Sequence, residues 1–298
     1  MARVLLVVCL AALCAGWSSA STDRTHGGNK VSDSDIKKLT EQLFTVDKHA
    51  LNSAVRIDLQ GKTYSSATDD KAPRPLLSVD ESRAKSANGN VALLARLYDK
   101  YTPDCTKAEK ETPEKKQQQS DLLDGLLATP VLTTTLNFLA GKGLVPTGKA
   151  AQKQFLNKLW FSLYSRGGGA LGSSAFEHVF LGELKHGDVS GMHSWLFFNK
   201  QEEAGKADYK GYIKKLPLGE SGTLLKVRFE WLDANKPVNS LFVGASPELE
   251  MSLYTLCFLS RPDQKCHVSA HGVNFYIQTW SFKLRDGFST IGSAYPSL

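Results

Sequence analysis

The 298-residue sequence predicts an α+β fold, in which a helical N-terminal lobe precedes a mostly antiparallel β-sheet lobe. Two observations support this. Apolar residues recur at helical spacing up to about residue 165, whereas alternating apolar residues dominate after the Gly-rich stretch RGGGALGSS. A composition of 42% hydrophobic and 22% charged residues is typical of a globular protein with a sizeable core.

The first residues predict a secretory signal peptide. Arg3 precedes the apolar run VLLVVCLAALCAGW, and the small residues SSA follow, so we expect cleavage after Ala20. This run is shorter than the roughly 20 apolar residues of a membrane-spanning helix, and no later run is longer. An uncleaved anchor is the alternative interpretation. We therefore expect a secreted protein without a transmembrane segment, with residues 21–32 as a flexible leader.

The helical lobe is expected to span residues 33–165. Ser32 or Ser34 is suited to cap the first helix, and Pro130 interrupts a later helical stretch. The stretch TKAEKETPEKKQQQSD is charged and poor in apolar residues, so we expect an exposed connector there.

The β-rich lobe is expected to span residues 166–298. In LKVRFEW, the alternating apolar residues predict one buried strand face. The stretch PELEMSLYTLCFL is an exception, because Ser246 and Pro247 are suited to begin a helix. The remaining candidate strands are AFEHVFLGEL, MHSWLFFNKQ, NSLFVGAS and VNFYIQTWSFKL.

Three cysteines remain after removal of the predicted signal peptide. Cys257 and Cys266 flank a turn-like segment and are suited to form a disulfide in an oxidising compartment, which would leave Cys105 free or paired elsewhere. No cysteine has a recognisable reactive setting. The net charge of +6 is compatible with a polyanionic partner, but is also common in secreted proteins that bind none.

Two histidines are candidates for proton transfer. If their segments are strands, His178 and His193 each lie on a face with aromatic residues, and the glycines between them favour a hairpin that brings the rings together. Imidazoles titrate near neutral pH and suit general acid and base roles. Two structural histidines are the alternative. Lys236, predicted in a turn between two strands, is a candidate to neutralise charge on a reacting phosphate.

Other chemistries find less support. The Gly-rich stretch lacks the Gly-Lys-Ser/Thr ending of a phosphate-binding loop, and no zinc-binding spacing occurs. Glu177, Glu183, His186 and Asp188 lie close in sequence and are candidates for loose contact with a divalent ion, although a solvated hairpin rim explains them equally well.

Four motifs together resemble the EndoU family of uridylate-specific endoribonucleases, in the type of its secreted animal members. They are FEHVFLGE, GMHSWLFF, KPVNSLFVGASPELEMSLYTLCF and IGSAYP, and the resemblance covers about residues 33–298. It implies cleavage of single-stranded RNA at uridines through the ribose 2′-hydroxyl, leaving 2′,3′-cyclic phosphate and 5′-hydroxyl ends. It also implies stimulation by manganese, although the chemistry does not require a metal.

The resemblance assigns roles to particular residues. His178, His193 and Lys236 are the catalytic set, with His193 as the base and His178 as the acid, and the lysine stabilises the phosphorane. Glu177 and Glu183 are supporting residues, and substrate-binding roles fall on Ser240, Ser293 and Tyr295. We expect a monomer. A catalytically silent protein that binds RNA or anionic lipid on the same fold is the alternative function.

Overall fold

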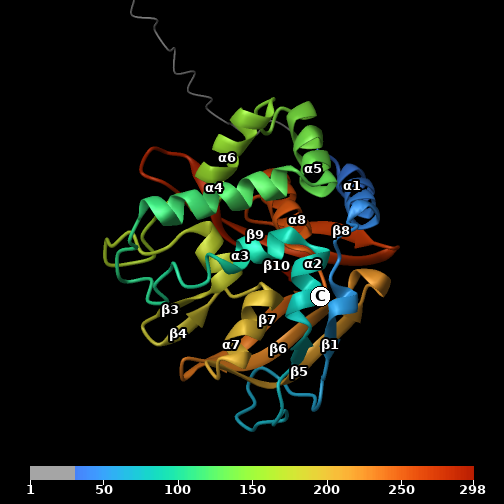
Figure 1. The fold of residues 1–298 in the computed structure, drawn as a ribbon, viewed down its shortest axis with the longest axis vertical. Coiled ribbons are helices and arrows are strands. Elements are labelled where there is room, and N and C mark those ends of the chain that lie inside the picture. The colour runs from blue at the N-terminus through green and yellow to red at the C-terminus, as the bar shows by residue number, and fades with distance from the viewer. Residues whose placement is uncertain (1–30) are drawn as a thin grey trace, which may run out of the picture. The chain divides into compact units, whose positions relative to one another are not determined.

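Helices precede antiparallel sheets in the computed structural model, which describes residues Val31–Leu298 (Figure 1). The α+β prediction is therefore confirmed. The described residues form one compact unit. The predicted signal peptide and nearly all of the predicted leader lie outside them, and the division into lobes at residue 165 stays a prediction.

The helices of the first half begin where the sequence offers caps. Ser32 and Asp35 form a capping box at the start of α1, with Ser32 Oγ 3.0 Å from the Asp35 amide. Pro130 stands in the first turn of α5, where its missing N–H costs nothing. The helices are α1 (Asp33–Val46), α2 (Glu81–Ala87), α3 (Gly89–Ala95), α4 (Pro113–Leu127), α5 (Pro130–Gly141) and α6 (Lys149–Phe161), with a 3-10 turn at Asn52–Ala54.

The expected exposed connector is partly wrong, because α4 begins within it at Pro113. Lys115 is buried, donates to Glu109 Oε2 at 2.6 Å and places its Nζ 3.7 Å from the ring centroid of Tyr101. Lysine rarely becomes buried unless it is paired. The sequence does not show that Lys115 pairs with Glu109, and its charge therefore led to the prediction of an exposed segment.

Two three-stranded antiparallel sheets form the second half, with the strand orders β5–β6–β7 and β10–β9–β8. The alternation predicted for β6 is confirmed, since Leu225, Val227, Phe229 and Trp231 are all buried. Strand β10 contacts β7, so the two sheets meet along these strands. The strands are β5 (Ala207–Pro217), β6 (Thr223–Trp231), β7 (Ala234–Val243), β8 (Lys265–Ala270), β9 (Val273–Lys283) and β10 (Ser289–Ser297), and a 3-10 turn lies at Gly219–Ser221. Two short strand pairs complete the fold, β1 (Val55–Ile57) with β2 (Leu77–Val79) and β3 (Glu183–Lys185) with β4 (Asp188–Ser190).

Helix α8 (Pro247–Ser260) confirms the helix that the sequence predicts, and Ser246 caps it. The helix is buried almost throughout. The disulfide between Cys257 and Cys266 joins α8 to β8 and confirms the predicted pairing. Cys105 is free and buried.

Two predicted strands are wrong. Glu177–Leu181 forms a π-helical turn, and the stretch after His193 forms α7 (Trp195–Glu203). Residues 175–183 and 192–199 are buried on every side. A fully buried segment has no exposed face, so its hydrophobic pattern cannot separate helix from strand.

Among the described residues, no single helix is long and apolar enough to cross a membrane. The pair α4 and α5 meets the criteria of length and composition only when taken together, across a bend of 85°.

Candidate active site

Backbone hydrogen bonds hold the two histidine segments together. The amide of Met192 donates to the carbonyl of His178 at 3.0 Å, and the amide of His193 donates to the carbonyl of Val179 at 2.7 Å. The β3–β4 hairpin lies between these segments, so the predicted fold-back is confirmed although neither histidine lies in a strand. Gly191 makes the approach possible. A Cβ at this position would lie 1.7 Å from the carbonyl oxygen of His178, and its φ of 71° also favours glycine.

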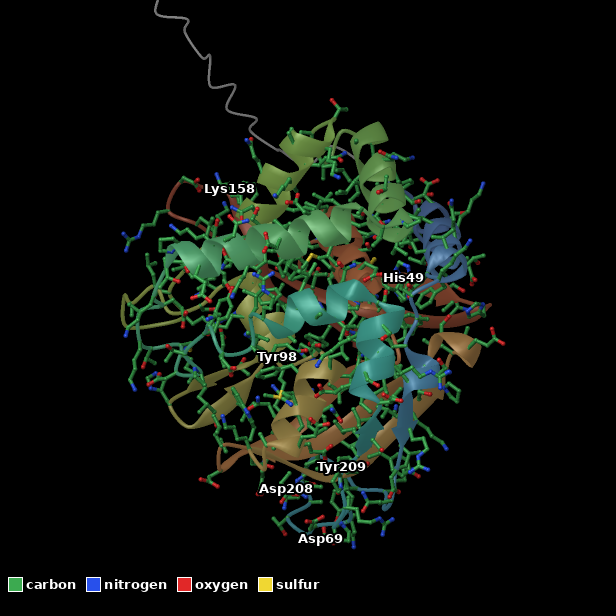
Figure 2. All side chains as sticks on the ribbon, viewed as in Figure 1. His49, Asp69, Tyr98, Lys158, Asp208 and Tyr209 are labelled. Carbon is green, nitrogen blue, oxygen red and sulfur yellow. A yellow bond between two sulfur atoms is a disulfide. The ribbon has the colours of Figure 1, made fainter. Side chains whose placement is uncertain are left out.

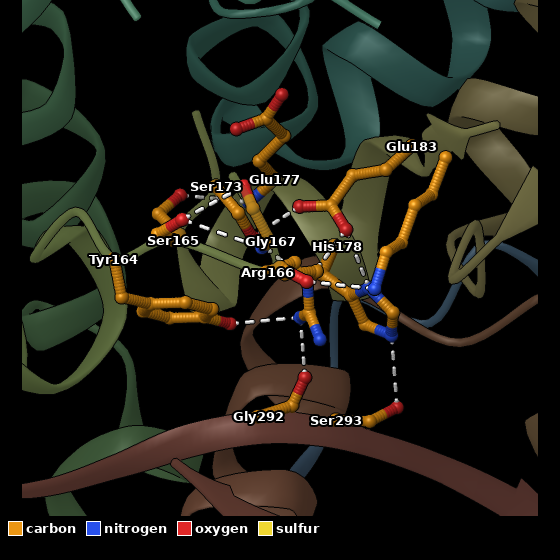
Figure 3. Close-up of polar contacts among 12 residues, drawn as sticks. Tyr164, Ser165, Arg166, Gly167, Ser173, Glu177, His178, Glu183, Gly292 and Ser293 are labelled. Atoms are coloured by element: carbon orange, nitrogen blue, oxygen red, sulfur yellow. Dashed lines mark hydrogen bonds and ion pairs between the residues drawn. The ribbon is translucent and has the colours of Figure 1, made fainter. Parts of the chain in front are cut away.

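The imidazole of His178 bonds through both nitrogens. Its Nδ1 lies 2.9 Å from Glu183 Oε2, and its Nε2 lies 3.1 Å from the hydroxyl of Ser293 (Figure 3). A carboxylate accepts only, so Nδ1 carries the proton and the neutral ring accepts at Nε2. This arrangement fixes the tautomer and lets Glu183 stabilise an imidazolium.

Glu183 is itself held by Arg166 and Ser173. The Nε of Arg166 lies 2.7 Å from Glu183 Oε2, and the hydroxyl of Ser173 donates to Oε1. Burial alone would raise the pKa of Glu183, but His178, Arg166 and Ser173 together hold it below its ordinary value. The carboxylate is therefore ionised beside His178.

His193 has a different partner. Its Nδ1 donates to the carbonyl of Ser240 at 3.0 Å, which leaves Nε2 as the acceptor of a neutral ring. The ring stacks on Tyr295, with centroids 4.9 Å apart and planes inclined by 24°. In the described part of the chain its Nδ1 partner is a carbonyl rather than a carboxylate, and the neutral ring is suited to accept a proton at Nε2.

Lys236 lies within β7, which corrects the predicted turn. The turn is Leu232–Asp233, and the lysine pairs with Phe229 across the sheet. Pro237 suggested a turn, but the strand register shifts here, and proline is tolerated at such irregularities. The ammonium donates to the carbonyl of Val189 at 3.0 Å, and burial lowers its pKa to about 8.

One cleft of about 640 Å³ collects the predicted catalytic and substrate-binding residues, from β7, β10 and the histidine segments. They are His178, His193, Lys236, Ser240, Ser293 and Tyr295. Glu177 and Glu183 lie behind this lining and are fully buried. The cleft therefore presents two imidazoles and an ammonium to one ligand.

Burial lowers the pKa of both histidines. For His178 the pKa falls to about 4, with the charge of Arg166 adding to burial and Glu183 opposing them. For His193 burial and the charge of Lys236 place the pKa well below its ordinary value. Both rings are therefore neutral at pH 7 in the free protein, and an anionic ligand would favour protonation.

Glu177 is neither in a strand nor facing solvent. Its carboxylate points away from the imidazole of His178 (Figure 3), and neither oxygen has a hydrogen-bond partner among the described residues. Burial, together with the charge of Glu183, raises its pKa well above the ordinary value. Ionisation of this buried carboxyl therefore lowers the free energy of unfolding.

We expect Glu177→Gln to become more stable relative to wild type as pH rises. The folded-state pKa is raised, so the folded protein holds a proton above pH 4.5 that the unfolded chain loses. Wild-type stability then falls by up to about 1.4 kcal/mol per pH unit from pH 4.5 to the folded pKa. Thermal unfolding at pH 4.5, 6 and 7.5 measures the difference, with exposed Glu220→Gln as the control. A difference that does not change with pH would contradict this prediction.

The acidic residues do not assemble a metal site. Within residues 31–298, no group of three or more His, Cys, Asp or Glu side chains is placed to hold an ion. Glu183 is occupied by Arg166 and His178, whereas Asp188 and His186 lie exposed at the β3–β4 turn. His186 therefore lies at the surface, as the alternative of a solvated hairpin rim predicts.

Arg166 is a site residue that the sequence interpretation missed. It opens the Gly-rich stretch, and besides Glu183 it contacts Tyr164 Oη at 2.8 Å and the carbonyl of Gly292 at 2.5 Å. It thereby links the histidine segment to β10 (Figure 3). The sequence offered one signal for this role: Arg166 is a cation beside glycines that precede the motif of His178.

Two imidazoles and an ammonium that face one cleft are suited to acid–base chemistry on an anionic substrate. The profile described as Endoribonuclease XendoU matches residues 35–296. The chain belongs to this family of RNA-cleaving enzymes.

Named relatives and a solved structure agree. The chain is 40% identical over 265 residues to uridylate-specific endoribonuclease EndoU of Drosophila melanogaster, covering 88% of this chain and 82% of that protein. It is 31% identical over 303 residues to uridylate-specific endoribonuclease C of Xenopus laevis, covering 99% and 100%. The solved structure of XendoU, described as a splicing-independent snoRNA-processing endoribonuclease, shares 32% identity with a TM-score of 0.74, covering 89% of this chain and 97% of that one.

Proposed function

We propose that this protein is a secreted endoribonuclease that cleaves single-stranded RNA at uridines, leaving 2′,3′-cyclic phosphate and 5′-hydroxyl ends. The observation that carries the proposal is the single cleft shared by His178, His193 and Lys236, with each histidine fixed through Nδ1. The uridylate- and poly(U)-specific names of relatives support the base preference.

Each catalytic side chain has a distinct role. His193 Nε2 takes the proton of the ribose 2′-hydroxyl, and the 2′-oxygen attacks phosphorus. The bond from phosphorus to the 5′-oxygen breaks, and protonated His178 gives its Nε2 proton to that oxygen. Glu183 supports the acid, because it stabilises the imidazolium. Lys236 stabilises the negative charge on the phosphorane oxygens.

Cleft residues near the histidines provide a place for the base. The ring of Tyr295 suits stacking on uracil, and the hydroxyl of Ser293 suits hydrogen bonding to its edge. Ser240 also lines the cleft and is suited to contact the phosphate. Trp280 also lines the cleft and is 49% exposed, so it offers a further aromatic face to a nucleotide.

Secretion is supported by one described feature. The Cys257–Cys266 disulfide fits an oxidising compartment, where the predicted signal peptide would deliver the chain. We propose that the enzyme acts as a monomer, since one chain supplies both histidines and Lys236 to the cleft.

The free cysteine has no part in the proposed reaction. Burial raises the pKa of Cys105 to about 11, so this thiol is not a nucleophile at neutral pH.

We expect kcat/KM to fall as pH rises from 5 to 7.5. Catalysis needs one protonated histidine, and the pKa of His178 in the free enzyme is about 4, so its protonated fraction drops by up to about tenfold per pH unit. A second decline follows above about pH 8, where Lys236 loses its charge. Initial rates on a short uridine-containing RNA across this range measure both limbs. A kcat/KM that rises through pH 5–7.5 would contradict the assignment of His178 as the general acid.

The base preference is tested with oligonucleotides that differ at one position. Wild-type protein should cut an RNA with a single uridine at that uridine and leave its cytidine or adenosine counterparts far less cleaved. Parallel reactions with manganese and with EDTA measure the metal dependence. Salt-sensitive RNA binding without any cleavage would instead support the silent binding protein.

A further inference from the structure

A second groove adjoins the active cleft. It encloses about 570 Å³ between the β9–β10 hairpin, the end of α6 and the Gly-rich stretch. Phe282 lines both the cleft and this groove, so the two hollows adjoin at this residue. A ligand that fills the cleft and extends past Phe282 therefore enters the groove.

The far wall of the groove is held in place. Lys158 on α6 pairs with Asp286 at 2.6 Å and places its Nζ 4.5 Å from the ring centroid of Phe288. Phe155 packs edge-on against the same phenylalanine, with centroids 5.9 Å apart. Figure 2 labels Lys158 near the end of the molecule where the hairpin tip meets α6. These contacts join the hairpin tip to the helix and form the far wall of the groove.

The lining of the groove suits an anionic strand. Lys283 and Arg285 are exposed, and neither forms an ion pair with another residue in the described part of the chain. Lys158 is a third cation, and Asp286 is the one carboxylate of the lining. Phe282, which stacks on the buried Tyr164 with centroids 4.3 Å apart, offers a partly exposed aromatic ring in this lining. Cations beside aromatic rings are typical of surfaces that bind single-stranded nucleic acid.

We propose that this groove binds the nucleotides of the RNA strand next to the scissile uridine, with Lys283 and Arg285 at their phosphates. The inference rests on the proposed function and extends it, because it makes the enzyme prefer substrates longer than a dinucleotide. The position of the groove beside the cleft, with Phe282 shared between them, and the two cations without an ion pair in the described part of the chain carry the proposal.

The test compares Lys283→Ala/Arg285→Ala with the control Lys37→Ala/Lys38→Ala on α1, which removes the same charge away from both hollows. We measure kcat/KM on a uridine-containing dinucleotide and on a decamer with one uridine. The ratio of decamer to dinucleotide should fall by about tenfold in the groove variant and stay at the wild-type value in the control.

A binding measurement separates this inference from the proposed function. A decamer with 2′-deoxyuridine cannot react, and its affinity for the groove variant should show a salt slope lower by about 1.4, for two phosphate contacts. The proposal is wrong if the groove variant keeps the wild-type ratio of kcat/KM for decamer over dinucleotide. It is also wrong if the salt slope of the groove variant equals that of the control. If wild-type protein cuts neither RNA, the proposed function fails, and the salt slope alone then decides whether the groove binds RNA.

Discussion

His193→Ala is expected to lower kcat for a uridine-containing RNA by about 10³-fold, within the range of general acid–base catalysis. The variant lacks the Nε2 that accepts the 2′-hydroxyl proton, because Nδ1 is already committed to the carbonyl of Ser240. RNA affinity should change little, since the imidazole is neutral and no phosphate contact is removed. Steady-state rates and binding to 2′-deoxyuridine RNA measure the two quantities.

His186→Ala provides the matched control. His186 lies exposed in the turn of the hairpin between the two histidine segments, so it shares the sequence neighbourhood without reaching the cleft. This variant should cut at the wild-type rate. If His193→Ala also cuts at that rate while remaining folded, the base assignment is wrong.

Lys236→Ala is expected to lower kcat/KM by roughly 10²- to 10³-fold, as is typical when one group that stabilises a transition-state charge is removed. The ammonium lies in the cleft, and its burial increases its electrostatic effect on a phosphorane oxygen.

Lys236→Arg separates charge from position. Arginine stays protonated, so the decline above about pH 8 should disappear even if the maximal rate is reduced. Exposed Lys48→Ala is the control for lost charge and should leave the rate unchanged. A Lys236→Ala variant with the wild-type kcat/KM and pH profile would remove the lysine from the mechanism.

Local signals explain what the sequence predicted well. Ser32 and Ser246 cap α1 and α8, at points where polar residues precede apolar ones in the sequence. The alternating apolar residues of β6 are buried. These features depend on neighbours a few residues apart. Motif resemblance predicts His178, His193 and Lys236 as the catalytic set, and the structure places all three in one cleft.

Tertiary burial explains what the sequence missed. The segments bearing His178 and His193 are enclosed on all sides, which removed the periodicity that would separate a helical turn from a strand. Arg166 reaches Glu183 only after the chain folds, and Glu177 is buried by elements distant in sequence. Such contacts join positions that no short sequence window contains.

Mass analysis of the products from an RNA with a single uridine tests the proposed reaction most directly. We expect a 2′,3′-cyclic phosphate on the upstream fragment and a 5′-hydroxyl on the downstream one, with no cleavage when that uridine is 2′-deoxy. Cleavage of the 2′-deoxy substrate, or fragments with a 5′-phosphate, would contradict it.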